Sequence, residues 1–289
     1  MAQLTADSKP RLASLNLIVN LNCLASSATL SFALIIFSSS AAEPAPPAVS
    51  AREIASRLSA QLEGTSYVRM LLEIKQSADN TKIALQVEIK ERRTKTTADV
   101  VYQVLWPKER KGEALLLHQT QGRPPTGALF VPPDKPRPLA AAEMSDPLFG
   151  SNLAYQDAIE NFFAWENQAI IGSEIVNRVN CVILESKPGK DDDSVYGSVH
   201  SWIDTRRLVP LRVDKLLPSG RLARRIETTR IAPDDKGRSI PANLAVQGGR
   251  DGSVTEVDGS RIKHDVNYTD HDFSLEGLAE ASAPQSPPR

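Results

Sequence analysis

The stretch SYVRMLLEIK (Ser66–Lys75) decides the fold class, because its side chains alternate between apolar and polar. The following stretch, KIALQVEIK (Lys82–Lys90), repeats that alternation after a short polar turn. Successive side chains of a strand point to opposite faces, so the pattern predicts antiparallel strands with one dry and one wet face. The residues that we expect to line an apolar interior are Val68, Met70, Leu72, Ile74, Ile83, Leu85, Val87 and Ile89.

The rest of the chain contains many more strand candidates and very little helix. The expected strands are 98–106, 113–119, 128–131, 167–176, 180–186, 194–204, 208–217, 221–231, 242–248 and 253–257. About a dozen strands joined by short turns favour one sheet over two separate domains. The predicted fold class is therefore mainly β, with one large curved antiparallel sheet forming a half-open β-barrel covered by a few short helices.

Two segments are available to cover the dry face. The first is a helix over Ser50–Leu62, where Ser50 and Glu53 have capping-box spacing and Ile54 and Leu58 share an apolar face. The second is a helix expected over Asn152–Trp165, with Ser151 or Asn152 as its cap. Its apolar face consists of Tyr155, Ile159, Phe162 and Phe163. Helical spacing leaves two interpretations open, a plain core helix and a lid over an apolar cavity.

The N-terminal region predicts export. An uncharged segment, Leu12–Phe37, follows Lys9 and Arg11, and Ser40 and Ala42 are small residues suited to signal-peptidase cleavage after Ala42. We therefore expect a signal peptide over 1–42, a Pro/Ala-rich tether over 43–49, a folded domain over 50–278 and a disordered tail over 279–289. An uncleaved inner-membrane anchor is the alternative, since about 20 apolar residues suffice to span a bilayer. The expected location is the periplasm.

Composition excludes several classes of partner and chemistry. The net charge of −1 gives no reason to expect nucleic acid as a partner. Only Cys181 remains after the predicted cleavage site, so no internal disulfide is expected in the mature chain. Cys181 alternates with Ile183 in an apolar strand, which indicates a buried small side chain rather than a reactive thiol.

Two polar groups of residues have the chemistry of a site, but their placement does not predict one. One is HDVNYTDHD, whose His264, Asp265, Asp270, His271 and Asp272 have metal-ligand chemistry but lie on one polar stretch that reads as a solvated turn. The other is Ser201 with His200 and Asp204, which has the residue types of a hydrolase triad. Adjacent strand residues diverge, and the glycine-flanked turn of a nucleophilic serine is missing here. We predict no catalytic residue, no metal and no cofactor.

Four landmarks together resemble the LolA/LolB-like superfamily of periplasmic lipoprotein-sorting proteins. FGSNLAYQDA (Phe149–Ala158) is similar to a loop, (M/F)-G-S-D-F-(S/T)-Y-E-D, of one branch of that superfamily. The others follow in family order and are WPKERKGEALLL (106–117), NCVILESKP (180–188) with YGSVHSWIDTRRLVPLRVDKLLPSGRLAR (196–224), and RIKHDVNYTDHDFSLEGL (261–278). Asn152, Leu153 and Gln156 depart from the loop pattern, which has Asp, Phe and Glu there.

The resemblance implies a half-open barrel, closed by helices, whose apolar interior takes acyl chains. It implies a carrier that shields lipid or lipoprotein acyl chains on the way to the outer membrane, with transport proteins of either membrane as candidate partners. Such a carrier needs no catalytic group, because each buried methylene contributes about 0.8 kcal/mol. The alternative is a structural or adaptor module of an envelope transport complex without lipid cargo.

Overall fold

The computed structural model describes residues 49–76, 81–190, 192–248 and 252–282. They belong to one compact unit that starts at Pro47. The expected signal peptide, most of the tether and the last part of the tail lie outside the described residues.

The described chain forms one antiparallel sheet of thirteen strands, which confirms the predicted fold class. The strands are β1 (Gly64–Lys75), β2 (Lys82–Arg93), β3 (Thr97–Trp106), β4 (Ala114–Thr120), β5 (Thr126–Phe130), β6 (Arg137–Pro138), β7 (Asn167–Val176), β8 (Val179–Lys187), β9 (Ser198–Asp204), β10 (Val209–Leu216), β11 (Leu222–Pro233), β12 (Ser239–Gly248) and β13 (Val254–His264). The helices are α1 (Ala51–Gln61), α2 (Tyr155–Ile159) and α3 (Leu275–Ser282).

The strand order explains how one segment comes to cover the sheet. Neighbours in the sheet are neighbours in sequence, except that β1 pairs with β13 and so joins β1–β6 to β7–β13. The two edges are therefore β6 and β7, which are consecutive in the chain. The connection between them has to run from one edge of the sheet to the other across a face. We call this connection, Leu139–Trp165, the cover.

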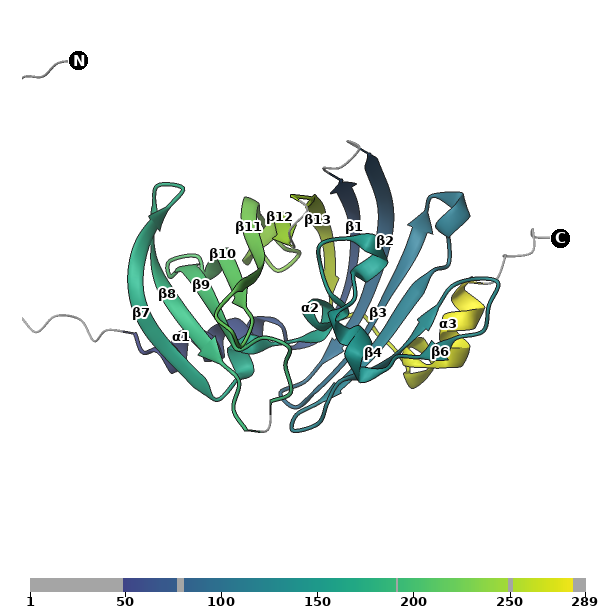
Figure 1. Cartoon of the computed structure of the whole chain (residues 1–289), viewed down its shortest axis with the longest axis horizontal. Coiled ribbons are helices and arrows are strands. Elements are labelled where there is room, and N and C mark those ends of the chain that lie inside the picture. Colours follow the sequence, from purple (N-terminus) through teal and green to yellow (C-terminus); the bar gives the residue numbers. More distant parts are fainter. Residues whose placement is uncertain (1–48, 77–80, 191, 249–251, 283–289) are drawn as a thin grey trace, which may run out of the picture. The chain divides into compact units, whose positions relative to one another are not determined.

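The sheet curves around the cover, and α2 lies between its two halves (Figure 1). The concave core joins the cover to strands from both halves. Its buried members are Met70, Leu72, Ile74, Leu85, Val87, Ile89, Ala98, Val100, Tyr102, Val104, Leu115, Leu117, Met144, Leu148, Phe149, Tyr155, Ala158, Ile159, Val246 and Val257. Each fully buried side chain of this kind contributes about 1.5–3 kcal/mol to folding, so the cover is held first by apolar contact.

Helix α1 packs on the same face near the β7 edge. Ser50 accepts a hydrogen bond from the backbone N–H of Glu53 at 3.2 Å, as the predicted cap requires. Ile54 and Leu58 are buried against Leu184 of β8 and Phe163 of the cover. The two segments that the sequence offered as covers thus both lie on the dry face.

The convex face carries its own small apolar patches. Phe273 and Leu278 pack with Val101 and Leu116, so α3 covers β3–β5 from outside. Helix α3 extends to Ser282, beyond the expected domain end at Leu278. Cys181 is fully buried, and burial raises the pKa of its thiol, in line with a packing role.

Candidate functional site

The residues expected to line the interior do share one face. In the β1–β2 pair, Val68, Met70, Leu72 and Ile74 lie opposite Ile89, Val87, Leu85 and Ile83, respectively. Six of the eight are buried in the concave core, and Val68 and Ile83 are partly buried against it. Gln86, between two of them, is exposed on the other face. The eight side chains therefore lie on the face that the alternation predicts, and the concave core that they join also contains side chains of the cover.

The expected single helix over Asn152–Trp165 is wrong. The cover contains α2, Tyr155–Ile159, and a separate 3₁₀ turn at Phe162–Ala164. Glu160 has extended backbone angles, and its side chain accepts hydrogen bonds from Ser194 and Gln156. Asn161 donates to the Ser59 hydroxyl of α1 at 2.9 Å. These buried polar contacts orient the chain across the sheet and end the helix at Ile159.

This break divides the four expected lid residues into two groups. Tyr155 and Ile159 belong to the concave core, together with the residues of β1 and β2. Phe163 packs against α1 and β8, and Phe162 contacts both this group and the buried Trp165. All four lie on the concave side, but they cover different parts of it.

The sequence predicts Ser151 or Asn152 as the cap of this helix, and that prediction is wrong. The N-cap is Ala154, whose backbone N–H donates to Asp157 Oδ2 at 2.7 Å. Asn152 instead ties the cover to the ends of β12 and β13. Its amide nitrogen donates to Ser253 Oγ at 2.7 Å, and its amide oxygen accepts from Thr255 Oγ1 at 2.8 Å. An amide supplies both a donor and an acceptor, whereas an ionised carboxylate supplies only acceptors, which accounts for asparagine at this position.

The turn into this loop is made by two residues with left-handed backbone angles. Phe149 has φ of +52° and Gly150 has φ of +83°. Glycine takes this conformation freely, while phenylalanine does so at a cost of about 1–2 kcal/mol. The side chain of Phe149 is buried in the concave core, and its carbonyl accepts from Arg110 at 3.2 Å. Packing thus holds the strained residue, and the FGSN landmark is the point where the cover enters the concavity.

Beneath the cover lies a cluster of buried charges that sequence reasoning missed. Lys215 Nζ of β10 lies 2.7 Å from Asp157 Oδ1 and 3.6 Å from Glu160 Oε2. Arg224 Nε of β11 lies 3.1 Å from Asp157 Oδ2. The Tyr196 hydroxyl donates to Asp157 Oδ1 at 2.7 Å and accepts from Arg224 at 2.6 Å. We call Asp157, Glu160, Tyr196, Lys215 and Arg224 the charge cluster.

Burial makes this cluster unusual. The side chains of Lys215, Asp157 and Glu160 are 3%, 2% and 4% exposed. A lysine is almost never fully buried unless it is paired, because desolvation of its charge is costly. The ring of Tyr196 also lies 4.8 Å from Lys215 Nζ, close enough for a cation–π contact.

The two carboxylates of the cluster respond differently to this environment. Burial by itself would raise the pKa of Asp157, but Lys215 and Arg224 outweigh it and lower that pKa below its usual value. For Glu160, burial dominates and raises the pKa, although Lys215, Ser194 and Gln156 oppose the shift. Gln156 is the second amide where the family loop has a carboxylate, and its amide nitrogen donates to Glu160 Oε1 at 2.7 Å. A glutamate at position 156 would add a third carboxylate next to those of Asp157 and Glu160.

One signal in the sequence pointed to this cluster. Lys215 follows Val213 by two residues in the strand LVPLRVDKLL, so it shares the apolar face of that strand. A lysine in an inward position of a strand predicts a buried counter-charge from elsewhere. The identity of that counter-charge, Asp157, depends on a contact 58 residues away in sequence, which local patterns do not encode.

A small cavity adjoins the cluster where the cover meets the β2–β3 turn. Its volume is about 90 Å³, and Glu160, Asn161, Arg93 and Trp165 are among the residues that line it. Pockets for drug-sized ligands usually measure about 300–1,000 Å³. This cavity is therefore smaller than a typical pocket for a drug-sized ligand. Arg93 donates to the carbonyls of Ile159 and Ala158 at 2.8 and 3.2 Å, so it holds the cover beside this cavity.

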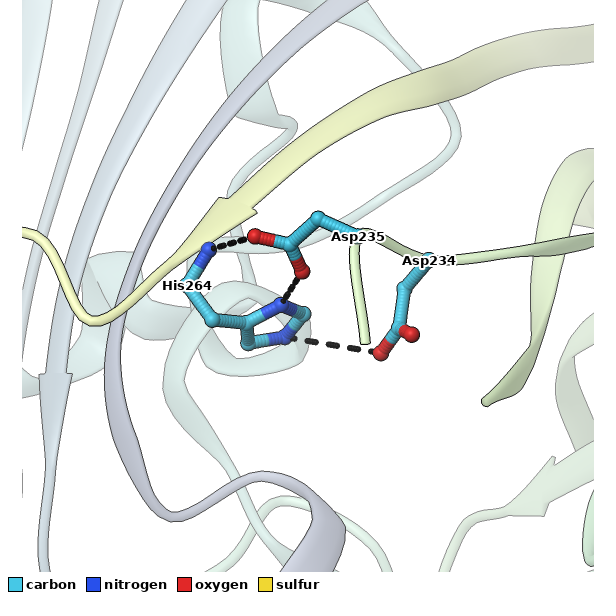
Figure 2. Close-up of side chains that lie close together, drawn as sticks. All are labelled: Asp234, Asp235 and His264. Atoms are coloured by element: carbon cyan, nitrogen blue, oxygen red, sulfur yellow. Dashed lines mark hydrogen bonds and ion pairs between the residues drawn. The ribbon is translucent and has the colours of Figure 1, made fainter. Parts of the chain in front are cut away.

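The residues of the HDVNYTDHD stretch that have metal-ligand chemistry do not converge on one point. Asp265 pairs with Lys236, Asp270 with Arg92, Asp272 with Lys90 and His271 with Glu280. His264, which ends β13, lies instead beside Asp234 and Asp235 of the β11–β12 turn (Figure 2).

The group around His264 has the donor types of a metal site, but an arginine occupies it. His264 Nδ1 contacts Asp235 Oδ1, and His264 Nε2 lies 2.8 Å from a guanidinium nitrogen of Arg238. The same guanidinium donates to Asp234 Oδ2 at 2.8 Å. A guanidinium is always charged and only donates, so the imidazole accepts at Nε2 and donates from Nδ1. Both ring nitrogens are thus engaged, and the arrangement does not fit a cation.

Ser201, His200 and Asp204 do not form a hydrolase triad. His200 contacts Glu185 at 3.2 Å, while the hydroxyl of Ser201 is buried on the opposite face of β9. Asp204 accepts from the backbone N–H of Arg206 and Arg207, so it fixes the turn after β9.

Within the described ranges, no helix has both the length and the apolar character required to cross a bilayer. The expected signal segment lies outside these ranges.

Comparison with known proteins identifies a family and a fold. The family model that matches spans residues 96–280 and is described as "-like: Uncharacterized protein". No curated protein matches the sequence.

Three solved structures share this fold, and the match covers nearly the whole length of each of them. A DUF1329 family protein from Desulfovibrio piger is 20% identical, with a TM-score of 0.72 over 79% of this chain and 97% of that one. A domain assigned to outer-membrane lipoprotein sorting, from Vibrio parahaemolyticus, is 20% identical, with a TM-score of 0.71 over 79% and 98%. A LolA superfamily protein from Nitrosomonas europaea is 18% identical, with a TM-score of 0.64 over 78% and 98%. At such identities the likeness establishes the fold.

Proposed function

Since this chain belongs to the family matched over residues 96–280 and has the LolA-superfamily fold, we propose that it is a carrier that shields lipid or lipoprotein acyl chains on its concave face. In this proposal the chain is exported, works in the periplasm and takes part in lipoprotein sorting or lipid transport to the outer membrane. Its partners are acyl chains and transport proteins of the inner or outer membrane. It performs no chemical reaction and uses no cofactor.

One observation carries the proposal: the concave core is covered by the connection between the two edge strands, with helix α1 beside it near the β7 edge. The cover contains one helix of five residues and short 3₁₀ turns, so few hydrogen bonds within it have to break when it moves. Its apolar side chains Met144, Leu148, Phe149 and Ile159 are buried against β1–β4. An acyl chain has the same apolar chemistry and can replace these side chains on the sheet at little net cost in burial.

The charge cluster gives the cover a defined closed position. Apolar contacts are not directional, whereas the ion pairs to Lys215 and Arg224 fix where Asp157 lies. A cover that closes to one position excludes water from the concave face while the carrier is empty.

Native mass spectrometry of the protein purified from its own periplasm tests the proposal. We expect mass increments of bound lipid that disappear after delipidation and return after incubation with a lipid extract. The variant Gln86→Lys, altered on the outer face, serves as a matched control and should behave as the wild type. Protein that binds no lipid before or after incubation would rule out the carrier.

An adaptor without lipid cargo is the second candidate, and the β7 edge of the sheet favours it. Ile170, Ile171 and Ile175 are exposed there, with Ile175 70% accessible. The opposite edge, β6, is two residues long and includes Pro138, which blunts it. A long open edge with apolar side chains can accept a strand from a partner protein. Under this alternative the cover stays closed and the same mass-spectrometry experiment shows no lipid.

A further inference from the structure

The charges under the cover are divided between the sheet and the cover. Both cations of the charge cluster, Lys215 and Arg224, belong to strands β10 and β11. Both carboxylates, Asp157 and Glu160, belong to the cover. Within the described part of the chain, the carboxylates recorded within ion-pair distance of Lys215 are these two. The neighbouring Asp214 pairs with Arg212 and Arg225 instead.

This division has a consequence for the open state. When the cover leaves the sheet, it takes both negative charges with it. Lys215 and Arg224 then remain side by side on the concave face, next to apolar side chains such as Val213, since they are direct partners across β10 and β11. The Tyr196 hydroxyl, 2.6 Å from a nitrogen of Arg224 in the closed state, can donate to the same place.

We propose that Lys215, Arg224 and Tyr196 form a binding site for the anionic head group of the carried amphiphile, and that Asp157 and Glu160 occupy this site while the carrier is empty. The inference rests on the proposed carrier function and specifies its cargo as an acyl chain with a phosphate or carboxylate head. The cover and the head group compete for the same two cations, so the arrival of an anionic amphiphile favours opening.

The chemistry of the site fits such a head group. A lysine ammonium and an arginine guanidinium offer several charge-assisted donors, and arginine matches phosphate and carboxylate oxygens in particular. The apolar floor begins next to the cations: Ile226 of β11 packs with Val199 and Val213 and also against the concave core. Head group and chain would thus find adjacent polar and apolar surfaces. An uncharged amphiphile would leave two cations without partners in a poorly solvated place, which is unfavourable.

Calorimetric titration with amphiphiles of one chain length tests the site. The ligands are dodecyl phosphate, laurate and the uncharged monolaurin, each below its micelle concentration, with inorganic phosphate as a fourth. We expect the wild type to bind the two anionic amphiphiles roughly tenfold to a hundredfold more tightly than monolaurin, as expected for hydrogen bonds to a charged group. Inorganic phosphate, which has no chain, should bind far more weakly than dodecyl phosphate.

Two variants locate the preference. Lys215→Met should lose most of the preference for anionic ligands and keep its affinity for monolaurin, while Lys263→Met, on an exposed lysine of β13, should keep the wild-type preference. Asp157→Asn removes the carboxylate of the cover that pairs with both cations and should bind dodecyl phosphate several-fold more tightly. If Lys215→Met does not fold, the wild-type preference and Asp157→Asn decide the question.

The outcomes separate this inference from the carrier function. Equal affinity of the wild type for anionic and uncharged amphiphiles, or no gain in affinity for dodecyl phosphate in Asp157→Asn, would overturn the head-group site and leave the carrier standing. Inorganic phosphate that binds as tightly as dodecyl phosphate would mean a site for free anions and would overturn it as well. A wild type that binds none of the three amphiphiles would overturn both proposals.

Discussion

Asp157 of the cover and Lys215 of β10 form an ion pair of 2.7 Å in which both side chains are almost completely buried. The two residues are brought together by the topology of the sheet: β6 and β7 are its edges, and the chain between them crosses the concave face. The pair therefore reports directly on whether the cover is closed.

Removing one charge of this pair should be costly. We expect Asp157→Asn to lower the free energy of unfolding by about 3–5 kcal/mol, because Arg224 loses this buried carboxylate and Lys215 is left with Glu160 at 3.6 Å. Denaturant unfolding at neutral pH measures this. The matched control is Asp270→Asn, whose carboxylate pairs with Arg92 but is 95% exposed, and it should change stability by less than about 1 kcal/mol. Similar values for both variants would show that the buried pair does not hold the cover.

The contribution of Glu160 to stability should depend on pH in the direction opposite to that of Asp157. Burial raises its pKa in the folded protein above the ordinary carboxyl value. A raised pKa means that the stabilising contribution of this residue is present below the unfolded pKa and is lost as the pH rises through the folded pKa. The pKa of Asp157 is lowered, so the stability that this residue contributes is lost only as the pH falls to more acidic values.

The variant Glu160→Gln should therefore be at least as stable as the wild type at about pH 7 and lose that advantage at about pH 5. Unfolding curves of both proteins at the two pH values isolate the effect, since all other titrating groups are shared. If the free energies of unfolding of the two proteins differ by the same amount at both pH values, Glu160 is ionised in the folded protein at both.

The orientation of β2 can be tested by a pair of adjacent substitutions. Leu85 is fully buried in the concave core, while Gln86 is exposed on the outer face. Leu85→Asp should cost several kcal/mol, because it buries a charge without a partner, and Gln86→Lys should be nearly neutral. Equal melting temperatures for the two variants would show that the register is wrong.

Export can be tested at the N-terminus. The uncharged segment ending at Ser40 and Ala42 predicts a mature chain that begins at or near Glu43. N-terminal sequencing of periplasmic material should find that residue. Recovery of the chain from Met1 only in washed membranes would identify the segment as an anchor.

The strands were predictable because their alternation is local. Each of the expected strands overlaps a strand of the structure, although β9 begins at Ser198 rather than at residue 194, and β13 continues to His264. The extension was missed because Ile262 is the one large apolar residue among 258–264 (DGSRIKH), so the sequence shows no alternation there. The two-residue β6 was missed because a strand that short has no periodicity to detect.

The cover was harder to predict, and the reason is physical. LAYQDAIENFFAW has helical spacing, and that spacing predicts where apolar side chains point only while the helix continues. Contacts of Glu160 with Ser194, and of Asn161 with Ser59, end the helix, and both partners are more than 30 residues away. Long-range polar contacts of this kind decide the local conformation, and a single sequence does not reveal them.

Hydrogen exchange across the cover tests the central claim most directly, because it reports whether this segment opens while the sheet stays folded. An element that must open is drawn from the less stable part of a structure, so we expect amides of 152–165 to exchange well before those of Lys82–Lys90 in β2. Bound dodecyl phosphate or monolaurin should then change protection throughout the cover and leave β2 unaffected. Protection equal to that of β2, with no response to either amphiphile, would contradict a cover that opens for acyl chains.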